Sequence, residues 1–137
     1  MSSPEIKMMA ISNVFSRVMH FKNAGDVEAG HRHFFDHGTL VSSGSAQFEI
    51  LDGYGGNVVS SKVISAPNFA FIAKETYHRI TALEDNTVCV CIHALREADE
   101  TILDPAFFIE QVDGDGKGSI PKAVIEKTDG SWHPIVM

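Results

Sequence analysis

The chain has 137 residues, of which 44% are hydrophobic and 21% are charged, a composition typical of a soluble globular protein with a sizeable core. Its formal net charge of −7, with no basic cluster to offset it, argues against nucleic acid or an anionic membrane as the main partner. No apolar run approaches the roughly 18 residues of a transmembrane helix, and the first residues lack the apolar segment of a signal peptide, so we expect a cytoplasmic protein.

Most of the chain through residue 95 is expected to form short strands separated by turns. Residues 1–13 carry Pro4 and scattered polar residues and are expected to be weakly structured at the start. Alternating apolar residues and the turn residues between them predict strands over 14–21, 37–43, 45–51, 58–65, 69–73, 78–82 and 87–95. The glycine-dense loop at 52–57 is typical of a hairpin turn. This succession of short strands predicts an all-β sandwich or barrel.

The last part of the chain differs from the rest. Residues 96–101 are charged and predict either a helical turn or a charged loop, and residues 106–112 predict a short apolar strand. We find no internal repeat and no second domain. We therefore expect residues 1–137 to form a single domain, with a C-terminal extension over 96–137.

Three histidines, His31, His33 and His37, lie within seven residues. On one straight strand His31 and His37 would be about 20 Å apart, whereas a ligand nitrogen must lie about 2.0–2.1 Å from its metal. A shared metal therefore requires the chain to bend between His33 and His37. The alternative is a polar cluster on the surface.

These residues resemble the first cupin motif, G-x5-H-x-H-x3-E-x6-G. Gly25, His31, His33 and Gly44 occupy motif positions, and His37 stands where the motif has Glu. The second motif, G-x5-P-x-G-x2-H-x3-N, is represented by His78 alone, because its other positions hold Pro67, Ala73, Glu75 and Ala82. The resemblance covers about residues 14–95, which would form the barrel core.

The resemblance implies a cupin double-stranded β-helix, or jelly-roll barrel, that holds one divalent transition metal ion per chain. Its ligands would be His31, His33, His37 and His78. Imidazole suits Fe, Ni, Cu and Zn, and Mn is compatible, so the sequence leaves the metal open. If His37 points away from the site, the ligand set reduces to the other three histidines.

Other polar residues near the motifs have more than one interpretation. Gln47, Glu49 and Asp36 are candidates to accept hydrogen bonds from the ligand histidines, or are ordinary polar residues. His93 is either an acid or base in the pocket or a surface residue. Cys89 and Cys91 share one face of a strand and are interpreted as small core residues rather than a redox pair. The phenylalanines are expected in the core and pocket wall: Phe34, Phe35, Phe48, Phe69 and Phe71.

The favoured function is that of a metal-dependent oxidoreductase, of the dioxygenase type, acting on a small organic molecule. Among cupins, all-histidine sites occur in metal-dependent oxygenases and in proteins of unsettled function, so the resemblance leaves alternatives. These are a non-catalytic module that binds a small molecule or metal, and a metal-dependent isomerase or lyase. We further expect a homodimer, because an open sandwich leaves sheet edges to cover.

Overall fold

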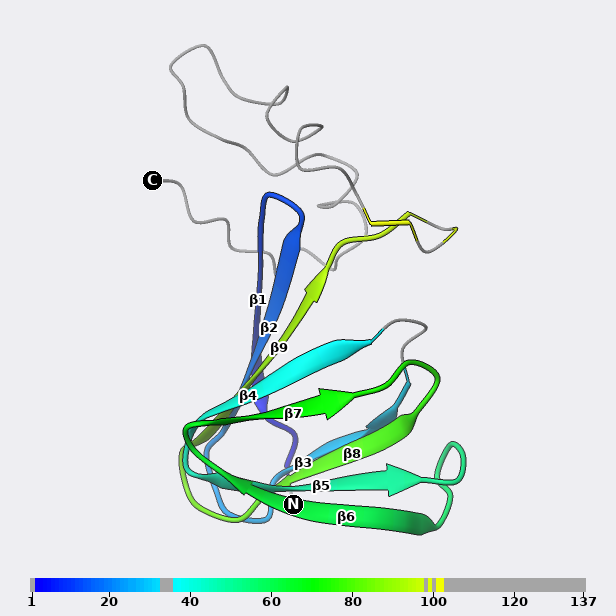
Figure 1. Cartoon of the computed structure of the whole chain (residues 1–137). Helices are drawn as coiled ribbons and strands as arrows, with labels where there is room; N and C mark the ends of the chain where they lie inside the picture. The colour runs from blue at the N-terminus through cyan, green and yellow to red at the C-terminus, as the bar shows by residue number, and fades with distance from the viewer. Residues whose placement is uncertain (1, 33–35, 98, 100, 103–137) are drawn as a thin grey trace, which may run out of the picture. The chain divides into compact units, whose positions relative to one another are not determined.

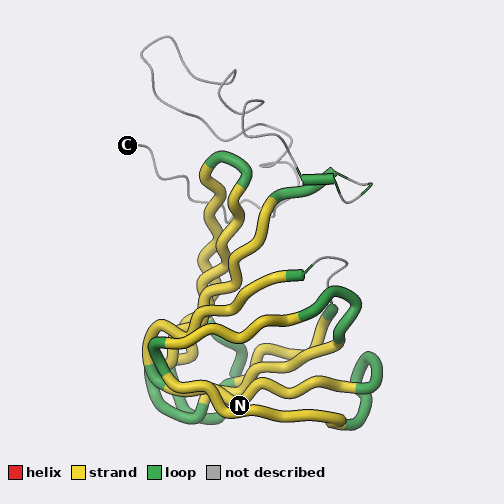
Figure 2. Tube along the Cα trace, in the orientation of Figure 1, coloured by secondary structure: helices red, strands yellow, loops and turns green. Residues whose placement is uncertain are grey.

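The computed structural model describes residues 2–32, 36–97, 99 and 101–102. The strands in chain order are β1 Glu5–Ile11, β2 Val14–Phe21, β3 Val27–His31, β4 His37–Ser43, β5 Ser45–Leu51, β6 Val58–Ser65, β7 Asn68–Ile72, β8 Tyr77–Ala82 and β9 Thr87–Ala94 (Figure 1). All regular elements within these ranges are strands (Figure 2), and a membrane-crossing helix is not found there. The strand expected over residues 106–112 lies outside the described residues.

The strands form two sheets, which confirms the all-β prediction. The five-stranded sheet has the order β1-β2-β9-β4-β7, and the four-stranded sheet has the order β3-β8-β5-β6. The expectation for the start of the chain was wrong, because residues 5–11 form β1. The only fully buried side chain of β1 is that of Ala10, so the alternation that marks a half-buried strand is missing from its sequence.

The chain separates into two compact units, which are described one by one. The first contains Met1–Ile6 and Val18–Cys91, and the second contains Lys7–Arg17 and Ile92–Met137. Strands β3 to β8 lie wholly in the first unit. In the second unit, the backbone N–H of Leu95 donates to the carbonyl of Asn13 at 2.7 Å. The expectation of a single domain over residues 1–137 stays a prediction.

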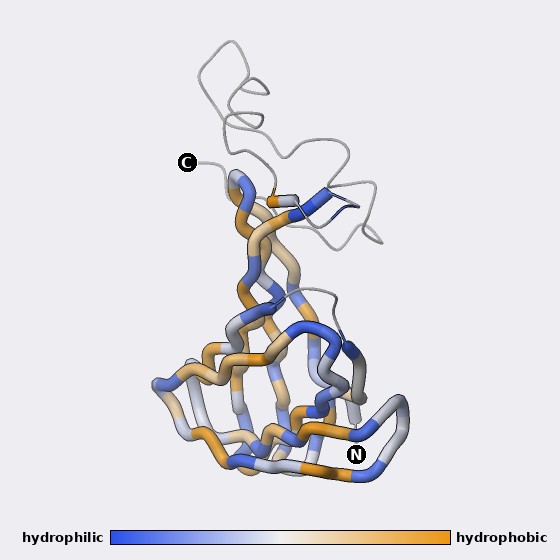
Figure 3. Tube along the Cα trace, turned by 45° about the vertical axis from the view of Figure 1, so that its right-hand side comes forward, coloured by the Kyte–Doolittle hydropathy of each residue, from blue (hydrophilic) through white to orange (hydrophobic). Residues whose placement is uncertain are grey.

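The core of the first unit is built from the inward side chains of both sheets. It includes Met19, Phe21, Val41, Phe48 and Ile80, all buried. Hydrophobic and hydrophilic residues alternate along parts of these strands (Figure 3). Because successive side chains of a strand point to opposite faces, the apolar set lies on the face toward the core. Cys89 and Cys91 belong to the same core and are free thiols, which confirms their interpretation as core residues.

Two phenylalanines expected in the core are outside it. Phe69 and Phe71 are 60% and 72% exposed. On β7 the inward positions are taken by Ala70 and Ile72, so the two phenylalanines fall on the opposite face. The expectation is confirmed for Phe48, whereas residues 34 and 35 lie outside the described residues.

The motif glycines stand where the backbone is left-handed. Gly25 has φ of +92° and Gly44 has φ of +73°, a region that side chains with a Cβ rarely enter. A Cβ on Gly44 would also contact the Thr87 hydroxyl and come within 3.0 Å of the Thr87 Cα. Glu75, which stands where the second motif has Gly, has φ of +60°. Glu75 therefore has a left-handed backbone, as Gly25 and Gly44 do.

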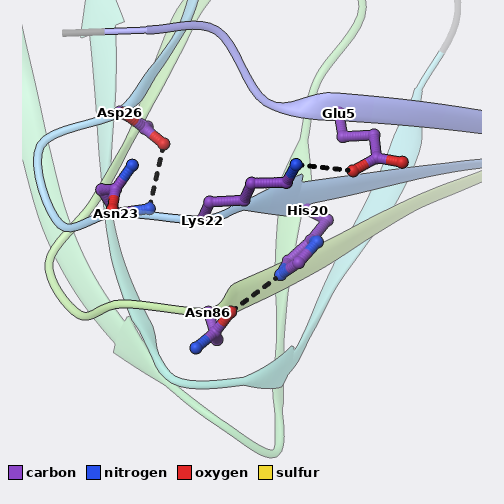
Figure 4. Close-up of polar contacts among 6 residues, drawn as sticks. All are labelled: Glu5, His20, Lys22, Asn23, Asp26 and Asn86. Carbon is purple, nitrogen blue, oxygen red and sulfur yellow. Dashed lines mark hydrogen bonds and ion pairs between the residues drawn. The ribbon is translucent and has the colours of Figure 1, made fainter.

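Polar contacts fasten the N-terminal segment to the turn before β3. The Asp26 carboxylate accepts hydrogen bonds from the Ser2 hydroxyl at 2.7 Å and from the Asn23 N–H at 3.0 Å. The Ser2 hydroxyl is the main reason that the pKa of Asp26 lies below its ordinary value. Nearby, Lys22 pairs with Glu5 at 3.4 Å and His20 contacts Asn86 at 3.1 Å (Figure 4). These contacts fix the turn from which β3 starts.

Candidate metal centre

Two of the predicted ligands, His37 and His78, meet in the interior of the first unit. His37 begins β4 of the five-stranded sheet and His78 lies on β8 of the four-stranded sheet. Their side chains are 3% and 1% exposed, and their ring centroids are 5.3 Å apart. The His37 ring is therefore buried beside that of His78, and the choice between the four-histidine and three-histidine ligand sets stays a prediction.

Strand register places a third predicted ligand beside this pair. The Cα of His31, the last residue of β3, lies opposite that of His78 in the antiparallel pairing of β3 with β8. His31 ends a strand of the four-stranded sheet and His37 begins a strand of the five-stranded sheet, while the bend expected between His33 and His37 falls on residues 33–35, outside the described residues. The side chain of His31 and the whole of His33 lie outside the described residues.

A backbone carbonyl sets the orientation of the His78 ring. Its Nδ1 lies 2.9 Å from the carbonyl oxygen of Thr76. A carbonyl only accepts hydrogen bonds, so Nδ1 carries the proton and the lone pair of the neutral ring is on Nε2. Histidines that bind metals are held in this way, with the other ring nitrogen donating to a carbonyl or carboxylate. The sequence did not reveal this partner, because a backbone carbonyl has no residue signature.

The residues expected to orient the ligand histidines have other partners. Glu49 accepts a hydrogen bond from the Arg79 guanidinium at 3.0 Å, and that bond is the main reason why the pKa of Arg79 is raised. Gln47 donates to the Ser61 hydroxyl at 3.4 Å. The Asp36 carboxylate accepts from the backbone N–H of Lys74 at 2.8 Å, which connects the start of β4 to the turn before β8.

Glu75, which stands where the motif has glycine, forms an ion pair with Arg32. Its carboxylate pairs with the Arg32 guanidinium at 3.0 Å, and that guanidinium lies 5.2 Å from the centroid of the Tyr77 ring. Arg32 directly follows His31 at the end of β3. The ion pair therefore joins the end of β3 to the turn that leads to His78, a link that glycine would not provide.

His93, the predicted acid or base, lies in the second unit. Its ring packs on Phe15 with centroids 4.6 Å apart, and its Nδ1 donates to the carbonyl of Ala94 at 2.9 Å. Burial lowers the pKa of His93; the hydrogen bond to Ala94 opposes this change and the charge of Arg96 adds to it. Its part in catalysis stays a prediction.

The donor pair fits a transition metal. Two buried imidazoles from the two sheets are the ligand type that Fe, Ni, Cu and Zn accept, and the hydrogen bond of His78 Nδ1 leaves its Nε2 as the nitrogen that carries the lone pair. Within the described residues no group of three or more metal-binding side chains is assembled. Two of the four predicted ligand side chains, those of His31 and His33, lie outside that description.

Comparison with known proteins identifies the fold. No family model and no curated protein matches the sequence. Among solved structures, the chain is similar to an uncharacterized conserved protein with a double-stranded β-helix domain from Klebsiella pneumoniae, with 19% identity, a TM-score of 0.55, and coverage of 67% of this chain and 76% of that one. A cupin 2 domain-containing protein from Halorhodospira halophila has 17% identity, a TM-score of 0.55, and coverage of 72% and 73%.

A third similar structure carries a named activity. The DMSP lyase DddQ from Ruegeria pomeroyi has 10% identity and a TM-score of 0.54, and the match covers 67% of this chain but 47% of that one. Identities this low establish the fold alone. The chain therefore has the cupin fold, an all-β double-stranded β-helix made of two antiparallel sheets.

Proposed function

We propose that the chain is a metal-dependent oxidoreductase, of the dioxygenase type, that adds both atoms of O2 to a small organic molecule. One divalent transition metal ion per chain would be held by His31, His33, His37 and His78. The observation that supports this is the buried pair of His37 and His78, whose rings are 5.3 Å apart and come from opposite sheets.

The residues around the pair suit this chemistry. When bound, the metal would supply a strong Lewis acid, because four neutral imidazoles leave its charge uncompensated. Thr76 holds His78 in the tautomer that presents Nε2. The cross-strand neighbours of the two histidines, Ile72 beside His37 and Ile50 beside His78, are apolar.

A second candidate is a metal-dependent lyase or isomerase, which turns over without oxygen. The structural similarity to a protein named as a lyase favours this candidate over other oxygen-independent reactions. A module that binds a small molecule or metal without turnover is the third candidate. All three use the same histidines, so the metal site is tested first.

The metal site is tested by elemental analysis of protein purified without chelators or a histidine-rich tag. We expect close to one equivalent of Fe, Mn, Ni, Cu or Zn per chain. His37→Glu should keep the metal, because it restores the usual residue at this motif position, whereas His37→Ala should weaken metal binding. His20→Ala is the matched control, because His20 contacts Asn86 at a distance from the site. Unchanged affinity and spectrum in His37→Ala would reduce the ligand set to three histidines.

The reaction class is tested on the Fe(II)-loaded protein. Oxygen uptake on addition of a panel of small organic acids, alcohols and phenols would support the dioxygenase. Product formed without oxygen uptake would replace it with the lyase or isomerase. Tight binding of a compound that is recovered unchanged would assign the chain to the non-catalytic module.

A further inference from the structure

A groove opens between the edge strands of the two sheets in the first unit. Strand β6 ends the order of the four-stranded sheet and β7 ends that of the five-stranded sheet. The groove between them has a volume of about 220 Å³ and contains the side chains of Phe48 and Ile64 from the core. Pockets for drug-sized ligands have about 300–1,000 Å³, so this groove suits a smaller molecule.

The lining of the groove is apolar except on one strand. Lys62 and Ser60 contribute the polar groups, and no acidic residue is found among the described residues that line it. Lys62 is paired across the sheet with Phe48, so the two side chains belong to the same face. The Lys62 ammonium has no ion pair or hydrogen bond with a described residue, and the same is true of the Ser60 hydroxyl. A lysine without an acidic partner among the described residues, in a groove that is otherwise apolar, favours the binding of an anionic ligand.

Strand register connects the groove to the metal centre. Two of its lining residues, Ile50 and Ile72, are the cross-strand partners of His78 and His37. Directly paired residues lie about 4.5–5.5 Å apart, so the inner end of the groove is next to both histidines. Phe48 and Ile50 are separated by two residues of β5, or roughly 7 Å. Lys62 lies on β6 and His78 on β8, on either side of β5, so their Cα atoms are also roughly 10 Å apart across the sheet. A ligand that spans from Lys62 to the histidine pair must therefore be longer than roughly 7 Å, less the length that the extended Lys62 side chain covers.

We propose that this groove binds a small organic monocarboxylate, with its carboxylate on the Lys62 ammonium and the Ser60 hydroxyl and its apolar body directed toward His37 and His78. The single positive charge of Lys62 balances one negative charge, and the Ser60 hydroxyl can donate a hydrogen bond to the same carboxylate. A dianion such as a phosphate monoester would leave charge uncompensated against Phe48 and Ile64, which is costly. Binding of the acid follows from the groove alone, whereas its role as substrate rests on the proposed function.

Lys62 is an exposed lysine on an edge strand and also has a simpler explanation. Such charges prevent edge strands from pairing with another chain. That role predicts a change in solubility when Lys62 is replaced, but no preference of the groove for one ligand over another. The two explanations are therefore separated by comparing a charged ligand with its neutral analogue.

The test is calorimetric titration with 3-phenylpropanoate and with its neutral analogue 3-phenylpropanamide. In the wild-type protein we expect the carboxylate to bind at least about tenfold more tightly, because hydrogen bonds to charged groups contribute enough for that ratio. Lys62→Gln should reduce the ratio to less than about threefold, and Lys62→Arg should keep it. Lys22→Gln is the matched control, because Lys22 pairs with Glu5 outside the groove.

Each outcome decides one of the proposals. Equal affinity for the two probes in the wild-type protein, or a ratio that survives Lys62→Gln, would overturn the groove proposal. Aggregation of Lys62→Gln with an unchanged ratio would assign Lys62 to edge protection. The titrations are run on chelator-treated and on metal-loaded protein. A preserved ratio in a protein that takes up no metal would overturn the metal site and leave the groove standing.

Discussion

Gly44, the motif glycine directly before β5, has both a left-handed backbone and a close contact with Thr87, so its replacement by alanine tests how strongly this turn stabilises the fold. Gly44→Ala places a Cβ on a residue with φ of +73°, which costs about 1–2 kcal/mol for an ordinary residue. The same Cβ would lie 3.0 Å from the Cα and 3.1 Å from the Cβ of Thr87. Thr87 is fully buried, and its hydroxyl lies 2.8 Å from the Glu84 carbonyl oxygen, so it cannot move aside. Overpacking of this kind costs roughly 1–3 kcal/mol more.

We therefore expect Gly44→Ala to lose about 2–5 kcal/mol of unfolding free energy, measured by urea titration and followed by far-UV circular dichroism. Two control variants separate the contributions. Gly25→Ala has φ of +92° but nothing within 4 Å of the new Cβ, so it should lose only the backbone cost of about 1–2 kcal/mol. Gly53→Ala has neither feature and should be close to neutral. Equal losses for Gly44→Ala and Gly25→Ala would refute the steric contact with Thr87.

Three further predictions concern ionisation, catalysis and assembly. Burial, and then the neighbouring Cys91, raises the pKa of Cys89 to about 12, so the stability that its thiol contributes is complete below about pH 9 and is lost between pH 9 and 12. By pH 10 the loss in the free energy of unfolding should be about 1.4 kcal/mol. Cys89→Val has no thiol to ionise, so the same loss in urea titrations of this variant would contradict the prediction. His93→Phe keeps a ring on Phe15 and should leave the metal content unchanged; a fall in turnover would support the predicted part of His93 in catalysis, and unchanged turnover would remove it. Light scattering should give a homodimer, whereas the monomer mass of 15.0 kDa at micromolar concentration would count against it.

Local sequence signals were sufficient for most of the strands. The hairpin of β5 and β6 has glycines at its turn and alternating residues on both sides, so its bounds could be predicted. Strand β3 was not predicted as an element, because Val27–His31 is short and contains Ala29 and Gly30, which carry little strand preference. It is specified instead by pairing with β8, a contact that a local pattern does not contain.

The candidate site was predictable as a set of residues but not as an arrangement. The spacing of His31, His33 and His37 indicated a metal and a bend, but the assignment of His31 and His37 to different sheets depends on the topology. Likewise, the groove beside the site depends on which face of an edge strand turns inward. The sequence of β7 has two phenylalanines and two smaller apolar residues in alternation, and larger side chains were assumed to be the buried ones.

The order of strands in the sheets also bears on how fast the chain folds. In the two sheets as described, β1–β2 and β5–β6 are the neighbouring pairs that are consecutive in sequence, whereas β3 must find β8 and β4 must find β7. Closing such long loops costs entropy before the contacts repay it, which makes β-rich domains of this kind fold in milliseconds to seconds rather than microseconds. The hairpin of β5 and β6 is the local unit onto which β8 can add, so it would form early. Until β8 arrives, the second edge of β5 is open to other chains, and refolding yield should therefore fall as protein concentration rises.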